Sequence, residues 1–428
     1  MDKNTLKQII LWQQSFVTSV SLQRRSLHIE PATCYVLVGM RRAGKSFLLY
    51  QHIQQLIADG HSVEEMLFIN FEDERLVGIT SAELHEILES YQELYGHQPI
   101  IFLDEIQNVE GWEHFARRLA DEKRTVFITG SNAHMLSREI AGTLGGRYVV
   151  KEVHPFAFHE YLEFKGVELS PHWELSPQRS EVVRLFDDYL LYGGLSECFR
   201  MQDKRSWLSS LYQKILFSDI VRRKGVRNER SLQLLVKKLA DCVLHPVAVK
   251  RLQNILQGDG TRISRETVGT YLAYLHEAYL TFGIGNFTDS VQEREQQKKY
   301  YFYDNGLLNL FLNSPETKLL ENIVAIDLYK HYGDSLYYYN RNVEVDFYVP
   351  SLGMAVQVSY AMTADDTRQR ELKALAALHR YAPLRRAVII TANTEEALTA
   401  GNGLSVDVIP IWKWLLTEEH TPLPLPVG

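Results

Sequence analysis

Apolar and polar residues alternate along the first third of the chain in a way that predicts strands and helices in turn. Short, mainly apolar segments predict strands at Cys34 to Val38, Met66 to Asn70, Ile100 to Leu103 and Val126 to Thr129. Apolar residues spaced three or four apart predict helices at Lys45 to Asp59, Ala82 to Tyr95 and Trp112 to Glu122. Strands that alternate with helices form a parallel sheet with both faces covered, so residues 31–150 are predicted to be an α/β domain.

The pattern changes before and after this core. Residues 1–30 predict a helix and a basic connector, and residues 151–228 predict a helical appendage. Residues 229–299 contain three short helical patterns and then a hairpin, and strands reappear in residues 300–420. The sequence therefore predicts several domains, as expected for 428 residues.

Composition narrows the class of protein. The chain is 45% apolar and 23% charged, which is typical of a soluble globular protein. A formal net charge of -7 argues against a strongly basic nucleic-acid coat but allows one basic face. Three widely spaced cysteines predict neither a disulfide framework nor a zinc cluster. With no signal-peptide or membrane-spanning pattern, the sequence predicts a cytoplasmic protein.

The first strand leads into the segment Gly39 to Ser46. This segment matches G-x-x-x-x-G-K-[ST], the phosphate-binding P-loop. An apolar strand precedes it and an amphipathic helix follows, which is the context that the chemistry requires. Glycines let backbone N–H groups surround phosphate oxygens, and the helix N-terminus adds partial positive charge. We expect Lys45 to reach the β- and γ-phosphates of ATP and Ser46 to hold Mg²⁺. The predicted nucleotide-binding residues are Gly39, Arg41, Arg42, Ala43, Gly44, Lys45, Ser46 and Phe47.

The strand Ile100 to Leu103 ends in two acids, Asp104 and Glu105. Asp104 is placed to hold Mg²⁺ through water, and Glu105 to polarise the water that attacks the γ-phosphate. An acidic strand end that only faces solvent is the alternative, and the preceding P-loop makes it the weaker one.

Two further polar positions are candidates for the same site. The strand Val126 to Thr129 runs into Gly130-Ser131-Asn132, so Asn132 or Ser131 could lie beside Glu105 and orient the water. A simple strand-ending turn explains these residues equally well. Arg147, after Gly145 and Gly146, could reach a neighbouring subunit's nucleotide as an arginine finger, or could be a surface residue.

Taken together, these segments resemble the prokaryotic family described as "predicted AAA+ ATPases". The resemblance rests on the P-loop, on Leu103 to Glu113, Ile128 to Asn132 and Leu144 to Arg147, and on Pro155 to Leu162. It covers nearly the whole chain. It implies an AAA-type ATPase domain joined to a C-terminal domain of unknown function.

Residues 229–299 can be read as a winged helix, which the resemblance also suggests. The helix that starts near Ser264 would expose Arg265, Thr270 and Tyr274 to a DNA major groove. Candidate phosphate contacts are Lys237, Lys238, Lys250 and Arg251. The alternative is a module that only packs domains or subunits together.

The last segment resembles the PD-(D/E)xK nuclease core, with gaps. Glu321 on a helix and Asp346 on a strand fit that pattern, but the final pair is Gln357-x-Ser359 in place of an acid and a lysine. Asp346 and Glu321 alone make a weak metal site. Lys373 or Arg370 on the next helix could take the role of the lysine. We expect a degenerate nuclease-like domain with a binding or structural role.

The sequence thus predicts a Mg²⁺- and ATP-dependent switch or motor that acts on DNA or on a protein partner through its C-terminal domains. One alternative is an ATP-gated, metal-dependent nuclease. Another is an ATP-regulated protein-interaction module without nucleic acid. A site shared between subunits, as Arg147 would make it, predicts a homo-oligomer.

Overall fold

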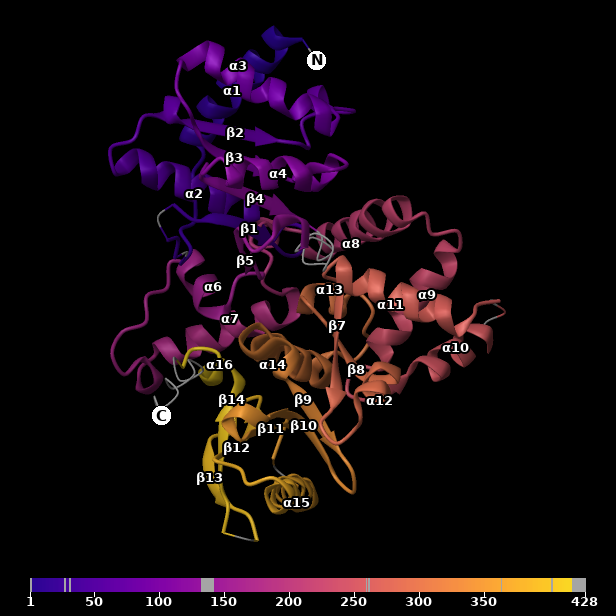
Figure 1. The fold of residues 1–428 in the computed structure, drawn as a ribbon. Coiled ribbons are helices and arrows are strands. Elements are labelled where there is room, and N and C mark those ends of the chain that lie inside the picture. Colours follow the sequence, from indigo (N-terminus) through magenta and orange to yellow (C-terminus); the bar gives the residue numbers. More distant parts are fainter. Residues whose placement is uncertain are drawn as a thin grey trace. The chain divides into compact units, whose positions relative to one another are not determined.

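The computed structural model describes residues 2–26, 28–30, 32–131, 142–258, 260, 262–362, 364–401 and 403–417 (Figure 1). The chain divides into two compact units. One contains Met1–Pro155 with Glu277–Tyr279, and the other contains Phe156–His276 with Leu280–Gly428.

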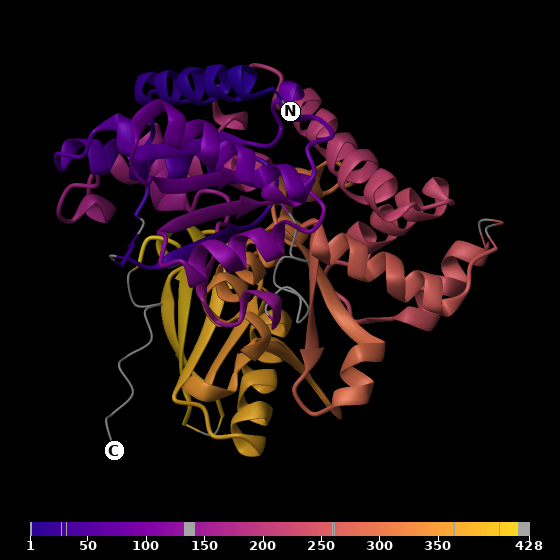
Figure 2. The same cartoon turned by 45° about the horizontal axis from the view of Figure 1, so that its top comes forward.

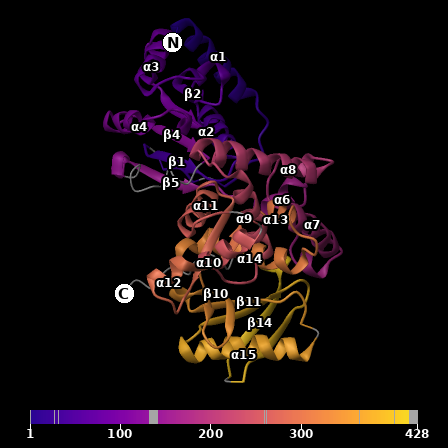
Figure 3. The same cartoon turned by 90° about the vertical axis from the view of Figure 1, so that its right-hand side faces the viewer.

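A five-stranded parallel sheet forms the centre of the N-terminal unit, in the order β2-β3-β4-β1-β5. Helices α3 and α4 lie on one face and α2 on the other (Figure 3). The strands are β1 (Cys34–Val38), β2 (Met66–Asn70), β3 (Ile100–Asp104), β4 (Val126–Gly130) and β5 (Tyr148–Glu152). The helices are α1 (Lys3–Ser19), α2 (Lys45–Ala58), α3 (Leu84–Tyr95) and α4 (Trp112–Asp121). The predicted parallel sheet, its four strands and its three helices are confirmed.

The fifth strand, β5, is absent from the prediction. It pairs with β1, yet Val149 and Val150 are 43% and 47% exposed. Its apolar residues stop after Val150 and are followed by Lys151 and Glu152, so the apolar segment is too short to predict a strand by itself.

Helix α1 covers the free edge of β2 (Figure 2, indigo). Gln13 and Gln14, which interrupt its apolar pattern, are buried and bond to that edge. Gln14 Nε2 donates to the Met66 carbonyl at 2.8 Å, and Gln13 Oε1 accepts from the Asn70 N–H at 3.0 Å. The two glutamines thus satisfy backbone groups that would otherwise be buried without partners.

The C-terminal unit is built on a nine-stranded mixed sheet in the order β13-β14-β12-β11-β10-β9-β7-β8-β6. Strands β9 to β12 pass between α14 and α15 (Figures 1 and 3). The strands are β6 (Val247–Ala248), β7 (Thr281–Asn286), β8 (Gln297–Phe302), β9 (Tyr337–Asn340), β10 (Glu344–Val349), β11 (Met354–Val358), β12 (Arg386–Thr391), β13 (Glu396–Thr399) and β14 (Ser405–Pro410).

Helices precede and flank this sheet. They are α6 (Phe158–Phe164), α7 (Gln178–Tyr192), α8 (Lys204–Lys214) with its π-helical extension Ile215–Arg222, α9 (Glu229–Asp241), α10 (Val249–Gly258), α11 (Arg265–Glu277), α12 (Val291–Gln296), α13 (Asn305–Asn309), α14 (Glu316–Tyr332), α15 (Asp365–Tyr381) and α16 (Ile411–Trp414).

The predicted boundary between residues 299 and 300 falls inside β8. Strand β8 pairs with both β6 and β7, and β7 pairs in parallel with β9 through Gly285 and Tyr337. The hairpin predicted for residues 229–299 is therefore continuous with the strands of residues 300–420. The residues of β8 are buried from Lys299 onward, so the aromatic segment that begins at Tyr300 is the buried part of this strand.

Candidate functional site

The P-loop connects β1 to α2 through unusual backbone conformations. Gly39, Arg42 and Gly44 have φ angles of +147°, +67° and +96°. A Cβ atom on Gly39 would lie 2.2 Å from the Val153 carbonyl oxygen, so only glycine fits there. Gly44 is the N-cap of α2, which places the N-terminal N–H groups of that helix at the loop.

Lys45 is buried beneath this loop, with 3% of its surface exposed. Its ammonium donates to the carbonyls of Gly39 and Met40 at 3.0 Å each and lies 3.8 Å from Glu105 Oε1. The loop therefore folds around the amine that the motif assigns to phosphate.

Asp104 and Ser46 meet at the carboxyl end of β3. Ser46 Oγ donates to Asp104 Oδ1 at 2.9 Å. Thr129, at the end of β4, donates to the same oxygen at 2.5 Å and accepts the Glu105 N–H at 2.9 Å. The hydroxyl and carboxylate assigned to Mg²⁺ thus adjoin each other, and Thr129 fixes both acids. Thr129 was not singled out from the sequence for this role.

Glu105 is held by two side-chain donors. Ser131 Oγ donates to Glu105 Oε1 at 2.6 Å, and Gln107 Nε2 donates to Oε2. The Glu105 backbone has a φ of +54°, in the left-handed region that non-glycine residues rarely adopt. A strained backbone conformation of this kind is typical of a functional position.

Neighbouring charges and hydrogen-bond donors set the pKa values of these two buried acids apart. Burial, reinforced by the charge of Glu105, raises the pKa of Asp104 to about 7. Burial alone would also raise the pKa of Glu105, but Lys45 and the donors Ser131 and Gln107 outweigh it and lower that pKa. Glu105 is therefore the carboxylate that stays ionised at neutral pH.

The remaining predicted residues of this unit have varied surroundings. Arg41 pairs with Glu72 at 2.9 Å, and the Phe47 ring is 46% exposed beside Tyr50. Ala43, in the loop itself, is buried. Arg147 pairs with Asp121 of its own chain at 2.5 Å. Asn132 lies outside the described residues, so the structure brings only Ser131 of that pair to Glu105.

Arg25, from the basic connector, was not predicted to belong to the site. Its guanidinium donates to the carbonyls of Ala43 at 3.0 Å and His154 at 3.1 Å. Gln51 of α2 holds the Arg25 backbone through two hydrogen bonds. Arg25 thus joins the connector, the P-loop and the segment after β5. The feature of the sequence that could have indicated this contact is the pair of adjacent basic residues, Arg24 and Arg25, shortly before the P-loop.

A second cluster lies in the C-terminal unit, where Glu321 and Asp346 do come together. The cation between them is Lys299 of β8, which the sequence analysis missed, and not Lys373 or Arg370. Arg370 pairs with Glu371. The Lys299 ammonium lies 2.9 Å from Asp346 Oδ1, 3.4 Å from Glu321 Oε1 and 2.7 Å from Glu344 Oε1.

The two atypical residues of the cluster bond elsewhere. Gln357 Oε1 accepts the Asp346 N–H at 3.1 Å, and Ser359 Oγ donates to the Ala361 carbonyl at 3.2 Å. Burial and the neighbouring Asp346 raise the pKa of Glu321 to about 7. Among the described residues, no group of three or more His, Cys, Asp or Glu side chains is arranged to hold a metal ion.

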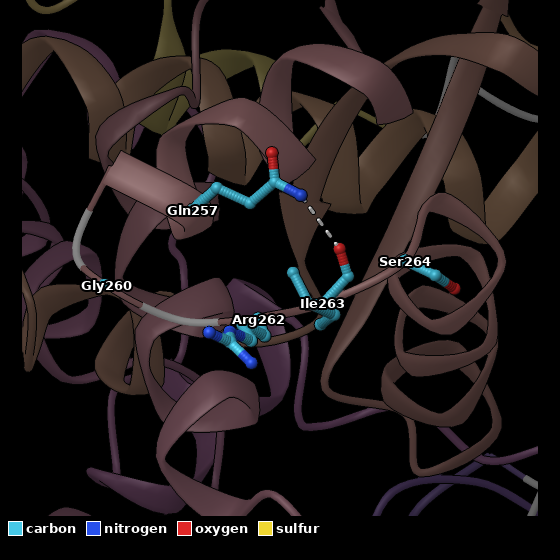
Figure 4. Close-up of a pocket in the computed structure, with 5 residues that line it drawn as sticks. All are labelled: Gln257, Gly260, Arg262, Ile263 and Ser264. Carbon is cyan, nitrogen blue, oxygen red and sulfur yellow. Dashed lines mark hydrogen bonds between the residues drawn. The ribbon is translucent and has the colours of Figure 1, made fainter.

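The turn between α10 and α11 borders an open hollow of about 610 Å³ (Figure 4). Gln257, Gly260, Arg262, Ile263 and Ser264 line it. Gln253 and Gln257 both donate to the Ile263 carbonyl, at 3.1 and 3.2 Å, and so fix the turn that leads into α11.

Comparison with known proteins identifies the family of the N-terminal domain. Residues 32–162 match the model of a family described as "AAA domain". An uncharacterized protein of Methanocaldococcus jannaschii, MJ1544, is 31% identical over 97% of this chain and 96% of its own length. The chain belongs to an AAA+ ATPase family. Residues 183–318 of this AAA+ protein match a domain of unknown function, DUF8612.

Other relatives are more distant or cover less. An uncharacterized protein of Haemophilus influenzae is 32% identical and covers 68% of this chain and 73% of its own. Two solved structures are similar at low scores. The Walker-type ATPase PABY2304 of Pyrococcus abyssi is 16% identical, with a TM-score of 0.40 over 72% of this chain and 95% of its own. The Aeropyrum pernix ORC1 protein, solved in complex with DNA, is 14% identical, with a TM-score of 0.32 over 76% and 93%.

In the ranges that the structure describes, none of the helices of this AAA+ protein combines the length and apolar character needed to cross a bilayer.

Proposed function

We propose that this AAA+ protein binds ATP with Mg²⁺ at the P-loop, hydrolyses it, and uses the change of nucleotide state to control a C-terminal module that holds DNA. The observation that carries the ATPase proposal is the convergence of Lys45, Ser46, Asp104 and Glu105 at one edge of the sheet. Ser46 and Asp104 fit Mg²⁺, because a hydroxyl and a carboxylate 2.9 Å apart are oxygen ligands of the kind that it prefers.

In this proposal each residue has one role. The α2 N-terminus and Lys45 hold the β- and γ-phosphates, and bound Mg²⁺ neutralises phosphate charge. Glu105, ionised at neutral pH, accepts a hydrogen bond from the attacking water and polarises it. Ser131 is a positioning residue, since it acts through Glu105.

Steady-state ATP hydrolysis and equilibrium nucleotide binding test the proposal together. Lys45→Ala should abolish nucleotide binding, whereas Glu105→Gln should keep binding and lose turnover. Lys330→Ala, an exposed lysine on α14, is the matched control and should behave as wild type. Wild-type turnover by Glu105→Gln would remove the assigned role of that residue.

The proposal that DNA is the partner rests on the concentration of basic residues in one part of the chain. Residues 204–276 contain 14 Lys and Arg against five Asp and Glu, whereas the whole chain has 46 against 53. A basic region in an acidic protein attracts a polyanion to one face.

The arrangement of elements in this region supports the same proposal. The order α9, β6, α10, α11 and then the hairpin β7–β8 is the order that the winged helix predicted for residues 229–299 would have. The predicted contact residues Lys237, Lys250, Arg251, Arg265 and Thr270 are exposed. Lys238 and Tyr274 are half-buried, and Lys238 lies 3.9 Å from Asp241.

A basic segment that the sequence analysis did not use extends this surface. Arg222, Arg223, Arg227 and Arg230 are exposed and form no ion pair within the described part of the chain. Lys224 of the same segment lies over the Tyr274 ring of α11 at 5.2 Å, which places the segment beside that helix.

Fluorescence anisotropy with labelled duplex DNA at several salt concentrations tests the partner. Binding that weakens linearly in log salt supports DNA, because displaced counterions are released. Salt-independent binding, or none with either ATP or ADP, would favour a protein partner.

A homo-oligomer with Arg147 acting between subunits is part of the same proposal and would appear as an ATP-dependent rise in mass by mass photometry.

A further inference from the structure

The cluster around Lys299 has an unusual composition for a buried site. The Lys299 side chain is 1% exposed, and its ammonium is within 3.4 Å of three carboxylates from two elements of the chain. Glu321 comes from α14, Glu344 and Asp346 from β10, and Lys299 from β8. A buried ammonium is stable only where opposite charges and acceptors surround it, and these acids provide them.

The contacts of Asp346 leave little room for another ligand. Asp346 Oδ1 accepts from Lys299, and Oδ2 accepts the Val358 N–H at 3.0 Å. Glu321 Oε1 accepts from the Tyr301 hydroxyl at 2.7 Å as well as from Lys299. Glu321 and Asp346, the two acids that the sequence predicted as a weak metal site, are thus already arranged around a cation supplied by the chain.

The distances and the charge of the lysine both exclude a metal ion from the position of its ammonium. Mg²⁺ and Ca²⁺ lie about 2.0–2.6 Å from their oxygen ligands, which is the space that the ammonium fills. Two like charges cannot share that space without a large repulsive cost.

We propose that the Lys299 ammonium is a built-in cation that takes the place of a divalent metal between Glu321, Glu344 and Asp346 and holds β8 to this cluster. The C-terminal domain then works as a metal-free binding module. Because β8 also pairs with β6 and β7, the same ion cluster joins the basic module to the sheet of β9–β12.

This inference is independent of the ATPase proposal and decides against the nuclease alternative. In a nuclease, a lysine beside the acids would assist a metal ion. Here the lysine replaces it.

Thermal unfolding with and without Mn²⁺ tests the inference, using Lys299→Met to remove charge at similar length. The variant should melt below wild type without Mn²⁺, and Mn²⁺ should raise its Tm by about 5 °C or more at saturation. Wild type and the double variant Lys299→Met/Asp346→Asn should show no such rise. The P-loop is common to all three proteins, so its own ion effects cancel. Lys298→Met, the neighbouring lysine outside the cluster, is the control and should behave as wild type.

A Lys299→Met variant that melts like wild type and ignores Mn²⁺ would overturn the inference. If Lys299→Met does not fold, a second measurement tests the inference. It counts the Mn²⁺ ions bound per molecule of wild type and of Asp346→Asn, both saturated with ATP. Equal numbers support the built-in cation, and one additional ion on wild type refutes it. Metal-dependent cleavage of plasmid DNA by wild type that is lost in Lys299→Met would also refute it.

Discussion

Ser131 donates a hydrogen bond to Glu105, with 2.6 Å between Ser131 Oγ and Glu105 Oε1. The two residues end neighbouring parallel strands, so the fold aligns them although 26 positions separate them. The bond fixes the carboxylate that we assign to water activation and links the end of β4 to the catalytic end of β3.

Replacing Ser131 by alanine should therefore slow turnover more than it weakens binding. Losing one hydrogen bond to a charged group costs about 2 kcal/mol, which corresponds to a kcat lower by about thirtyfold. Measured kcat and KM for ATP separate the two effects, and Ser180→Ala on α7 serves as an exposed control. A rise in KM at unchanged kcat would place Ser131 in binding and not in positioning.

Nucleotide binding should depend on pH through Asp104. Its pKa is raised to about 7, and Mg²⁺ needs the carboxylate, so Mg²⁺-dependent ATP affinity should rise between about pH 6 and pH 8. Glu105→Gln removes the neighbouring charge and should move this rise to lower pH. Isothermal titration across this range measures both, and an identical profile in the variant would contradict the coupling.

The free energy of unfolding of the nucleotide-free protein should also depend on pH through Asp104. A carboxyl group whose pKa is higher in the folded state binds more protons there, so the free energy of unfolding falls as pH rises from the unfolded pKa. For Asp104 this window runs from its ordinary pKa of 3.8 to about 7. Asp104→Asn should make the profile less steep in this window, where Glu321 with its raised pKa also contributes, as measured by urea unfolding.

Gly39→Ala should damage the P-loop by steric conflict. The added methyl group would meet the Val153 carbonyl at 2.2 Å, so the loop or β5 must move. We expect ATP binding to be lost and stability to fall by about 2 kcal/mol, a size typical of overpacking. Gly269→Ala in α11 has open space and should instead gain about 0.5–1 kcal/mol. Differential scanning calorimetry measures the stability of both variants relative to wild type.

The exposed arginines beside α11 should contribute to DNA affinity through phosphate contacts. Replacing Arg222 and Arg223 by alanine should lower the slope of log affinity against log salt by about one to two. Arg380→Ala on α15, also exposed, is the control and should leave the slope unchanged. An unchanged slope in the double variant would exclude this segment from the interface.

Gln14→Leu should destabilise the N-terminal unit. The change leaves the Met66 carbonyl without its buried donor, which costs about 1–3 kcal/mol. Gln92→Leu, at an exposed position of α3, should cost much less. Urea unfolding of both variants measures the difference.

The sequence by itself determined the features that lie within one short segment. The P-loop, the apolar strand ending in Asp104 and Glu105, and the alternation of strands and helices are local patterns, because backbone geometry and periodic burial act over a few residues. These patterns predicted the parallel sheet, which the structure contains, and the nucleotide site, and residues 32–162 match the model of an AAA domain.

Tertiary structure decided which distant residues complete each site. Thr129 and Ser131 reach the acids only because parallel strands end at one edge of the sheet, and Arg25 reaches the P-loop from the connector. Lys299 lies 47 positions from Asp346, on a strand assigned to a different domain, and no local pattern could place it there. A buried charge is stable only with its partners, and those partners come from the fold and not from the neighbouring sequence.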